Sequence, residues 1–147
     1  MSAAKQKGTK WETDLVRSLG GFFEGRYGLA PRRVAQEGFL DSGDIHGISP
    51  FVAQAKNYKS WEEAIRLGLD GAEKQKGRAG ESYGVAFVKR VRRSVGDGYA
   101  VMTVATFARL LLRLRRAEAL LALHARDEVQ SVHERESAED ERREYPR

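Results

Sequence analysis

The sequence predicts a mixed α/β or α+β domain with a central five-stranded mixed sheet flanked by helices. Three observations lead to this class: apolar residues at helical spacing near the N-terminus, short runs rich in valine and aromatic residues in the middle, and a long leucine-bearing segment after residue 105. The predicted order of elements is helix, three strands, helix, two strands, helix. A chain of 147 residues is long enough for one such domain.

The first helix is expected over residues 7–20. Trp11, Leu15 and Leu19 recur at intervals of four and would form one apolar face. Gly20 and Gly21 follow directly, and we expect this pair to end the helix.

Three short strands are then expected, over residues 32–36, 44–48 and 51–57. Asp41, Ser42 and Gly43 are residues typical of a turn, and they separate the first strand from the second. Ser49 and Pro50 predict a tight turn between the second and third strands, which would make these two strands a hairpin.

A second helix is expected over residues 60–78, with Ser60 as its N-cap and two glutamates in its first turn. Its apolar face would include Trp61, Ala64 and Ala72, and two glycines weaken this face in the middle. Strands are expected over residues 83–89 and 99–104. A long helix is expected over residues 106–124.

The charge of the chain is unevenly distributed. Residues 1–116 carry 21 Lys and Arg against 12 Asp and Glu, whereas residues 117–147 carry 5 against 9. A domain with this positive excess suits a polyanionic partner such as DNA. Residues 126–147 have almost nothing apolar to bury, so we expect a domain over residues 1–125 and a charged, flexible tail after it, either frayed helix or disordered.

Several protein classes are not favoured by the composition. The chain has no cysteine, so it can form neither a disulfide framework nor a thiolate metal site. No apolar run approaches the roughly 18 residues that a membrane span requires, and the N-terminus does not resemble a secretory signal. We therefore expect no membrane partner and a cytoplasmic location, in the host cell if the protein is phage-encoded.

A candidate metal site lies on the predicted hairpin. Alternation in a strand places Gln54 and Lys56 on one face, and Asp44 would lie on the neighbouring strand. Mg²⁺ prefers oxygen ligands, which the Asp44 carboxylate, the Gln54 amide and the Ala55 carbonyl would supply. Lys56 would hold or deprotonate the attacking water, or stabilise the charge that develops on the phosphate.

Two further polar residues are predicted to point inward from the helices. Glu12 shares a helix face with Leu15 and Leu19, and a half-buried carboxylate there needs a metal-bound water or a basic side chain as partner. Gln75 follows Ala72 by three residues on the apolar face of the second helix. Glu12 and Gln75 are therefore candidate catalytic residues beside the strand residues.

Each of these residues also has a plain structural interpretation. Asp44 follows Ser42 and Gly43 and fits a turn. Gln54 with Lys56 is nearly meaningless alone, Glu12 would pair equally well with a surface lysine, and Gln75 fits the boundary of the core. The joint arrangement of these five residues is what favours a site.

These residues fall within a longer pattern, "KGTKWETDLVRSL", "RRVAQEGFLDSGDIHGI", "FVAQAKN", "GAEKQKGRAGESYGVAFVKR" and "YAVMTVATFARLL". This pattern resembles the PD-(D/E)xK nucleases, and more narrowly the Holliday junction resolvase-like proteins of archaea and of phages that infect actinobacteria. The resemblance spans roughly residues 7 to 112. It implies a restriction-endonuclease-like core with active-site positions at Glu12, Asp44, Gln54 and Lys56.

The resemblance further implies Mg²⁺ or Mn²⁺ as cofactor, a homodimer, and paired symmetric cuts in four-way DNA junctions. Gln54 departs from the family pattern, which usually has Glu at this position. Three accounts compete: a tolerated variant in which Glu12 compensates, an inactivating substitution, or a protein that binds junctions without cutting them. A nuclease of this fold with another DNA substrate is a further alternative.

Basic residues predict where DNA would be bound. They lie before or on the first helix, on the first strand, after the third strand, at the end of the second helix and in the loop before the last strand, and phosphate contacts suit such arms and loops. Among the aromatic residues, base stacking is open to Tyr27, Tyr58 and Trp61, but packing is the more ordinary role. His46 is expected near the site or facing DNA. The candidate DNA-binding residues are Lys5, Lys7, Lys10, Arg32, Arg33, Lys59, Lys74, Lys76, Arg78, Lys89, Arg90, Arg92 and Arg93.

Overall fold

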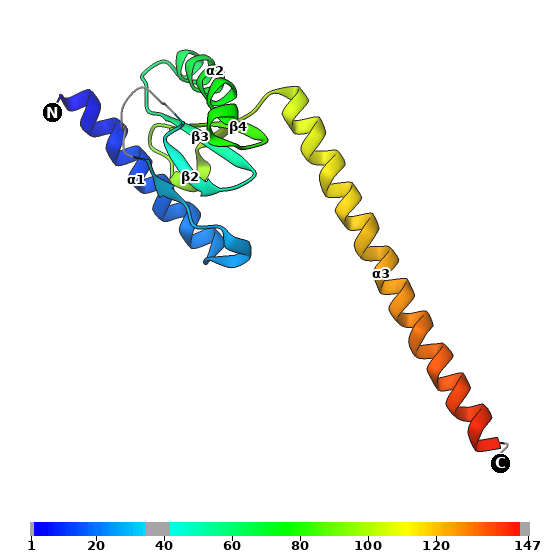
Figure 1. Cartoon of the computed structure of the whole chain (residues 1–147). Helices are drawn as coiled ribbons and strands as arrows, with labels where there is room; N and C mark the ends of the chain where they lie inside the picture. The colour runs from blue at the N-terminus through cyan, green and yellow to red at the C-terminus, as the bar shows by residue number, and fades with distance from the viewer. Residues whose placement is uncertain (1, 35–41, 145–147) are drawn as a thin grey trace. The chain divides into compact units, whose positions relative to one another are not determined.

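The computed structural model describes residues 2–34 and 42–144, with side chains described as far as residue 137. The predicted class is confirmed at the coarse level, because the described chain is α+β with a five-stranded mixed sheet and three α-helices (Figure 1). In order, the elements are α1 (Ala3–Phe23), η1 (Arg26–Gly28), β1 (Arg32–Arg33), β2 (Ile45–Ile48), β3 (Phe51–Lys56), α2 (Trp61–Ala79), β4 (Tyr83–Val88), η2 (Val95–Asp97), β5 (Tyr99–Val101) and α3 (Val104–Glu144).

The strands lie in the order β1-β2-β3-β4-β5. β2 pairs antiparallel with both β1 and β3, and β5 pairs antiparallel with β4. β3 and β4 are parallel, which is possible because α2 connects them as a crossover. The predicted hairpin of β2 and β3 is confirmed, and its turn contains Ser49 and Pro50.

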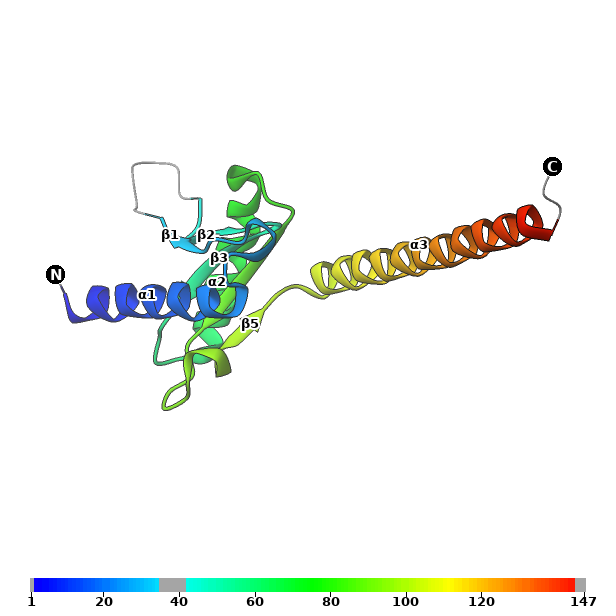
Figure 2. The ribbon, with the colours of Figure 1, turned by 90° about the horizontal axis from the view of Figure 1, so that it is seen from below.

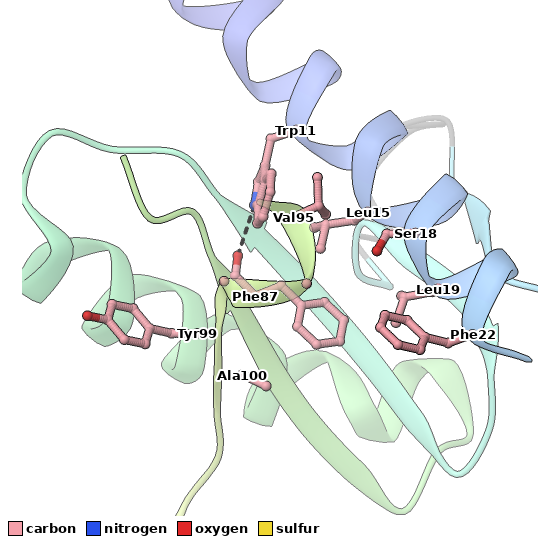
Figure 3. A pocket seen from close by; sticks show the side chains of 11 residues that line it. Trp11, Leu15, Ser18, Leu19, Phe22, Phe87, Val95, Tyr99 and Ala100 are labelled. Atoms are coloured by element: carbon pink, nitrogen blue, oxygen red, sulfur yellow. Dashed lines mark hydrogen bonds between the residues drawn. The ribbon is translucent and has the colours of Figure 1, made fainter. Parts of the chain in front are cut away.

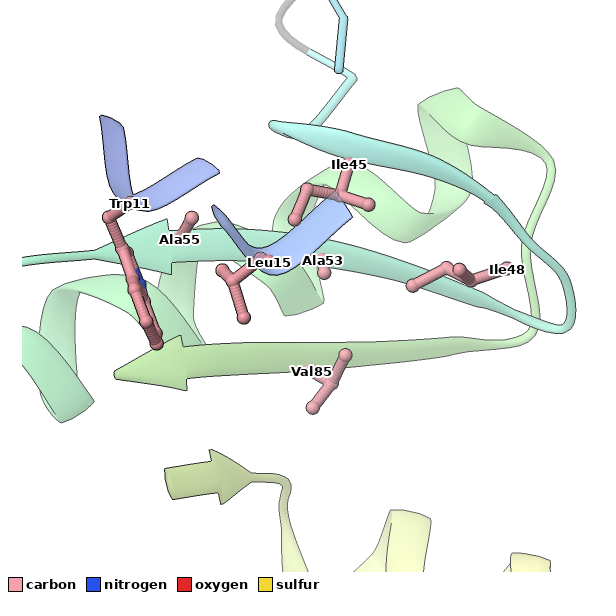
Figure 4. Close-up of a cluster of buried hydrophobic side chains, with 7 residues drawn as sticks. All are labelled: Trp11, Leu15, Ile45, Ile48, Ala53, Ala55 and Val85. Carbon is pink, nitrogen blue, oxygen red and sulfur yellow. The ribbon is translucent and has the colours of Figure 1, made fainter. Parts of the chain in front are cut away.

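One face of the sheet packs against α1. Trp11 and Leu15 of this helix form a buried cluster with Ala53, Ala55 and Val85, together with Ile45 and Ile48 (Figure 4). Figures 1 and 2 show α1 and α2 on either side of the strands. The predicted apolar face of the first helix is therefore confirmed.

The opposite face packs against α2. Ala64 of α2 forms a second cluster with Ala86 and Val88 of β4. Ser60 caps the helix as predicted, because its hydroxyl accepts a hydrogen bond of 3.2 Å from the backbone N–H of Glu63. The two clusters use alternate residues of β4, Val85 in the first and Ala86 and Val88 in the second, as the pleat of a sheet requires.

The backbones of α2 and the sheet approach closely at Gly84. A Cβ added to Gly84 would lie 2.7 Å from the backbone carbonyl carbon of Ala72. We therefore expect Gly84→Ala to lower the free energy of unfolding by about 1–3 kcal/mol, as overpacked cores do. Gly77→Ala is the matched control: nothing lies within 4 Å of its Cβ, so the variant should gain about 0.5–1 kcal/mol of helix propensity. Urea unfolding of both variants measures this, and equal stabilities would contradict it.

Several predicted boundaries were wrong. Gly20 and Gly21 do not end the first helix, which continues to Phe23 and has Glu24 as its C-cap in the left-handed conformation. Phe23 packs against the α1 core cluster, and this burial offsets the low helix propensity of the two glycines. Predicted strand residues 35 and 36 lie outside the described residues.

The final helix is longer than predicted at both ends. It begins at Val104, because the Thr103 hydroxyl accepts a hydrogen bond of 3.1 Å from the backbone N–H of Thr106 and caps it. β5 therefore ends at Val101 and not at residue 104. The helix also continues to Glu144 through the boundary predicted at residue 125, because alanine, arginine and glutamate favour a helix even where little is buried.

The compact units of the chain are Met1–Thr106 and Phe107–Arg147. Within the described residues, no helix combines the length and the apolar character that crossing a bilayer requires.

The expected packing of Tyr27, Tyr58 and Trp61 was wrong, because these residues are 96%, 42% and 64% exposed.

Candidate active site

Asp44 directly precedes β2 and lies beside β3. Its backbone N–H donates to the carbonyl of Ala53 at 2.9 Å, and its own carbonyl accepts from the N–H of Val34 at 3.0 Å. Its carboxylate Oδ2 accepts a hydrogen bond of 2.8 Å from the backbone N–H of Ala55. The Asp44 side chain is thus anchored to β3 at Ala55, the middle residue of the Gln54-Ala55-Lys56 triplet.

Gly43 makes this placement of Asp44 possible. Its φ of +102° lies in the region that favours glycine, and a Cβ there would be only 2.5 Å from Cγ2 of Val52. Of the residues predicted as a turn before Asp44, Asp41 lies outside the described residues. The positive φ and the crowding at Gly43 explain why the backbone needs glycine at this position.

Gln54, Lys56 and Gln75 form a chain of hydrogen bonds on the α2 side of the sheet. The Lys56 ammonium donates to Oε1 of Gln54 at 2.6 Å, and Nε2 of Gln54 donates to Oε1 of Gln75 at 2.6 Å. Gln54 and Gln75 are both buried. The structure therefore brings together three of the predicted residues and fixes which end of the Gln54 amide faces the lysine.

Two glycines of α2 provide the space for this chain. A Cβ at Gly68 would lie 3.0 Å from Cγ of Lys56, and one at Gly71 would lie 3.4 Å from Cγ of Gln54. The sequence interpretation treated these glycines only as a weakness of the apolar face. Their role could have been predicted from the spacing, because Gly71 and Gly68 precede Gln75 by four and seven residues and all three lie on one face of the helix.

Glu12 is on α1 and therefore lies on the opposite face of the sheet from the Gln54, Lys56 and Gln75 side chains. Its carboxylate Oε2 is 2.9 Å from both Nε and Nη2 of Arg33 on β1. The expectation that a basic side chain would serve as its partner is confirmed, but the partner is an arginine of β1. A cavity of about 400 Å³ is lined by Glu12, Arg33 and Asp44, together with Lys5, Gly8, Thr9 and Val34.

Asp44 therefore belongs to two groups of polar residues. It shares the cavity with Glu12 on the α1 side, and through Ala55 it adjoins Gln54 and Lys56, whose side chains face α2. The N–H and the carbonyl of one strand residue point to the same neighbour. The Ala55 carbonyl is consequently directed toward the β2 side, where Asp44 lies.

The donor atoms at this margin suit a hard divalent cation of the size of Mg²⁺. Two carboxylates, from Asp44 and Glu12, line one cavity on the α1 side. The Ala55 carbonyl is a further oxygen donor beside Asp44, whereas the Gln54 amide oxygen lies on the α2 side of the sheet and accepts from the Lys56 ammonium. In residues 2–34 and 42–137, no three acidic or histidine side chains gather closely enough to hold a metal by themselves. Mg²⁺ often binds through one or two carboxylates and keeps several waters, so this donor set fits.

The predicted DNA-binding residues have different environments. Lys5 and Arg33 line the cavity, and Lys7, Lys59 and Arg32 are exposed. Others are engaged by neighbours: Lys10 pairs with Asp14 at 3.1 Å, Lys76 with Glu73, Lys89 lies over the Trp11 ring, and Arg90 lies over the Tyr99 ring. Lys74, Arg78, Arg92 and Arg93 are exposed, and His46 Nε2 contacts the backbone oxygen of Ser42 at 2.6 Å.

A second cavity, of about 190 Å³, lies between the C-terminal half of α1 and the segment that contains η2 and β5 (Figure 3). Its walls are mainly apolar, and the Trp11 indole N–H donates to the carbonyl of Phe87 at 3.2 Å beside it. The polar side chains among its described lining residues are those of Ser18 and Tyr99, apart from the bonded indole. This cavity has no carboxylate among its described lining residues, whereas the cavity of Asp44 and Glu12 has two.

Comparison with protein-family models, with curated proteins and with solved structures found no significant match for this chain.

Proposed function

We propose that this protein is a Mg²⁺- or Mn²⁺-dependent DNA endonuclease that selects branched DNA, four-way junctions above all. The observation that carries the proposal is the hydrogen bond between the Asp44 carboxylate and the Ala55 N–H, which fixes an acid beside Gln54 and Lys56. An acid and a lysine at the margin of two strands, next to a cavity with a second acid, suit phosphodiester hydrolysis.

The chain's own residues have distinct tasks in this proposal. Asp44 and Glu12 from the α1 side, the Ala55 backbone carbonyl, and the Gln54 side-chain amide oxygen from the α2 side would hold the cation, which when bound supplies Lewis acidity and a more acidic water. The Lys56 ammonium orients the attacking water or stabilises the charge that develops on the phosphate. Gln75 positions the Gln54 amide through its hydrogen bond.

Phosphate contacts are assigned to the cations around the cavity. Lys5 and Arg33 line it, and Lys7 and Lys59 are exposed on the adjoining elements: Asn57 Nδ2 donates to the Lys7 carbonyl at 3.2 Å. Such contacts position DNA without reading bases, which suits recognition of a junction by its shape. Because two symmetric cuts require two active sites, we expect a homodimer.

The order of elements supports a restriction-endonuclease-like core. One helix, a β2–β3 hairpin, a crossover helix and the parallel strand β4 follow in the same order that the resemblance to PD-(D/E)xK nucleases implies. The acid lies before β2 and the lysine ends β3, which are the positions that the resemblance assigns to them.

A second candidate function is junction binding without cleavage. Its specific support is the Gln54 amide, which is neutral and is held between the Lys56 ammonium and Gln75. An amide contributes one oxygen and no charge, so the cation would be held more weakly than by a carboxylate.

A cleavage assay on three substrates of the same sequence content tests these functions: a four-way junction, a flapped duplex and a linear duplex, each with Mg²⁺, Mn²⁺ or EDTA. We expect nicking of the junction in preference to the linear duplex, with none in EDTA. Equal cutting of all three would instead indicate a nuclease with another substrate. Tight, salt-dependent junction binding with no product in any metal would indicate the non-catalytic binder.

A further inference from the structure

We infer that α3 pairs with the α3 of a second copy of this chain, antiparallel, through one apolar stripe. The stripe consists of Phe107, Leu111, Leu114, Leu121, Ala125, Val129 and Val132, whose spacings of three, four and seven residues place them on one side of a helix. Glu118 lies on the same side between Leu114 and Leu121, and its carboxylate pairs with Arg115 at 2.9 Å. Its six large side chains are all between 46% and 71% exposed.

A helix with such a stripe is stabilised when another element packs against the exposed apolar side chains. α3 has 41 residues, which corresponds to about 60 Å, and helices in proteins gain most of their stability by packing an apolar face. Large exposed apolar patches on proteins usually mark interaction sites. An apolar stripe of this length is matched by another helix of the same kind, and a second copy supplies one.

The charges along α3 select the antiparallel orientation. Residues 107–124 carry four arginines and one glutamate, whereas residues 126–137 carry two arginines and four carboxylates. A parallel pair would place the arginine-rich halves side by side. An antiparallel pair places each arginine-rich half beside the acidic half of its partner, and charges that flank an apolar seam set the orientation of paired helices.

Two leucines on opposite faces of α3 make the test sharp. Leu121 lies in the stripe and is 69% exposed, while Leu112 is 72% exposed and lies nine residues away, about two and a half turns. We expect Leu121→Gln to raise the dimer dissociation constant by about 100-fold or more, because the dimer buries this side chain twice. Leu112→Gln should change it by less than about threefold.

Sedimentation of the full chain measures the mass, and circular dichroism checks that both variants keep their helix content. A monomeric parent would overturn the inference and would be the result if α3 were covered by its own chain or by another protein. Equal sensitivity to the two substitutions would overturn the assignment to the stripe. The inference shares with the proposed function the expectation of a homodimer. Neither readout involves DNA, so failure of the α3 pairing is distinguishable from failure of the nuclease activity.

The orientation is tested by cross-linking, since the chain contains no cysteine of its own. With a short bismaleimide, Leu111→Cys alone should give no cross-linked dimer, whereas a mixture of Leu111→Cys and Val132→Cys should. In an antiparallel pair the two copies of residue 111 lie at opposite ends of the seam. Efficient cross-linking of Leu111→Cys to itself would overturn the antiparallel arrangement.

Discussion

Asp44→Asn is expected to abolish metal-dependent cleavage of the four-way junction, with a loss on the order of 10³-fold or more. A metal ion contributes several kcal/mol to phosphate hydrolysis, and each 1.36 kcal/mol corresponds to tenfold in rate. Asparagine keeps a side-chain oxygen that can accept from the Ala55 N–H, so the substitution removes the charge and leaves the anchoring hydrogen bond available. Single-turnover cleavage with saturating enzyme measures the effect on the chemical step.

Asp70→Asn is the matched control. Asp70 is exposed on α2, and the same loss of one negative charge there should leave cleavage within about twofold. Thermal unfolding of both variants shows whether the fold survives. A folded Asp44→Asn protein that cuts the junction at the parent's rate would remove Asp44 from the site, and with it the observation on which the nuclease proposal depends.

The features of the site that were predictable from sequence are local ones. Alternation along β3 correctly placed Gln54 and Lys56 on the same face, and helical spacing correctly placed Gln75 toward the sheet. Both inferences need only the period of one element. The hairpin that brings Asp44 to β3 was likewise signalled by the turn residues before and after β2.

The features of the site that the sequence did not predict depend on contacts between elements far apart in the chain. The Glu12–Arg33 pair joins α1 to β1, and it exists only because β1 adds to the edge of β2. Similarly, Gly68 weakens an apolar face when α2 is considered alone, yet it faces the Lys56 side chain in the folded unit. A periodic pattern indicates which face of a helix is buried, but not the volume of the side chain opposite it.

The apolar pattern of the sequence did not reliably predict burial or helix length at the ends of the elements. Trp61 has the spacing of a core residue but is 64% exposed at the first position of α2. Residues 126–144 carry few apolar side chains and are helical, which is one of the two alternatives expected for them, since their helix propensity is high. Apolar content alone therefore predicted neither the exposure of Trp61 nor the state of this tail.

Gln54→Glu is expected to lower the Mg²⁺ concentration required for half-maximal cleavage by about tenfold or more. A carboxylate adds a full negative charge next to a divalent cation, and even in a water-like dielectric this attraction reaches about 2 kcal/mol at 4 Å. The Lys56 ammonium, which already donates to the Gln54 oxygen, would keep that contact and strengthen it by charge. A metal titration of junction cleavage, with Mg²⁺ and with Mn²⁺, measures the shift.

The position of Gln75 supplies the control. Nε2 of Gln54 donates to Oε1 of Gln75, so a glutamate at residue 54 requires the Gln75 amide to turn and offer its own NH₂ group. Gln75→Glu adds the same charge at the other end of this hydrogen bond, and an equal fall in the metal requirement there would indicate a general field and not a ligand. If Gln54→Glu folds and stays as inert as the parent in Mn²⁺, the site does not hydrolyse DNA, and junction binding without cleavage becomes the better account.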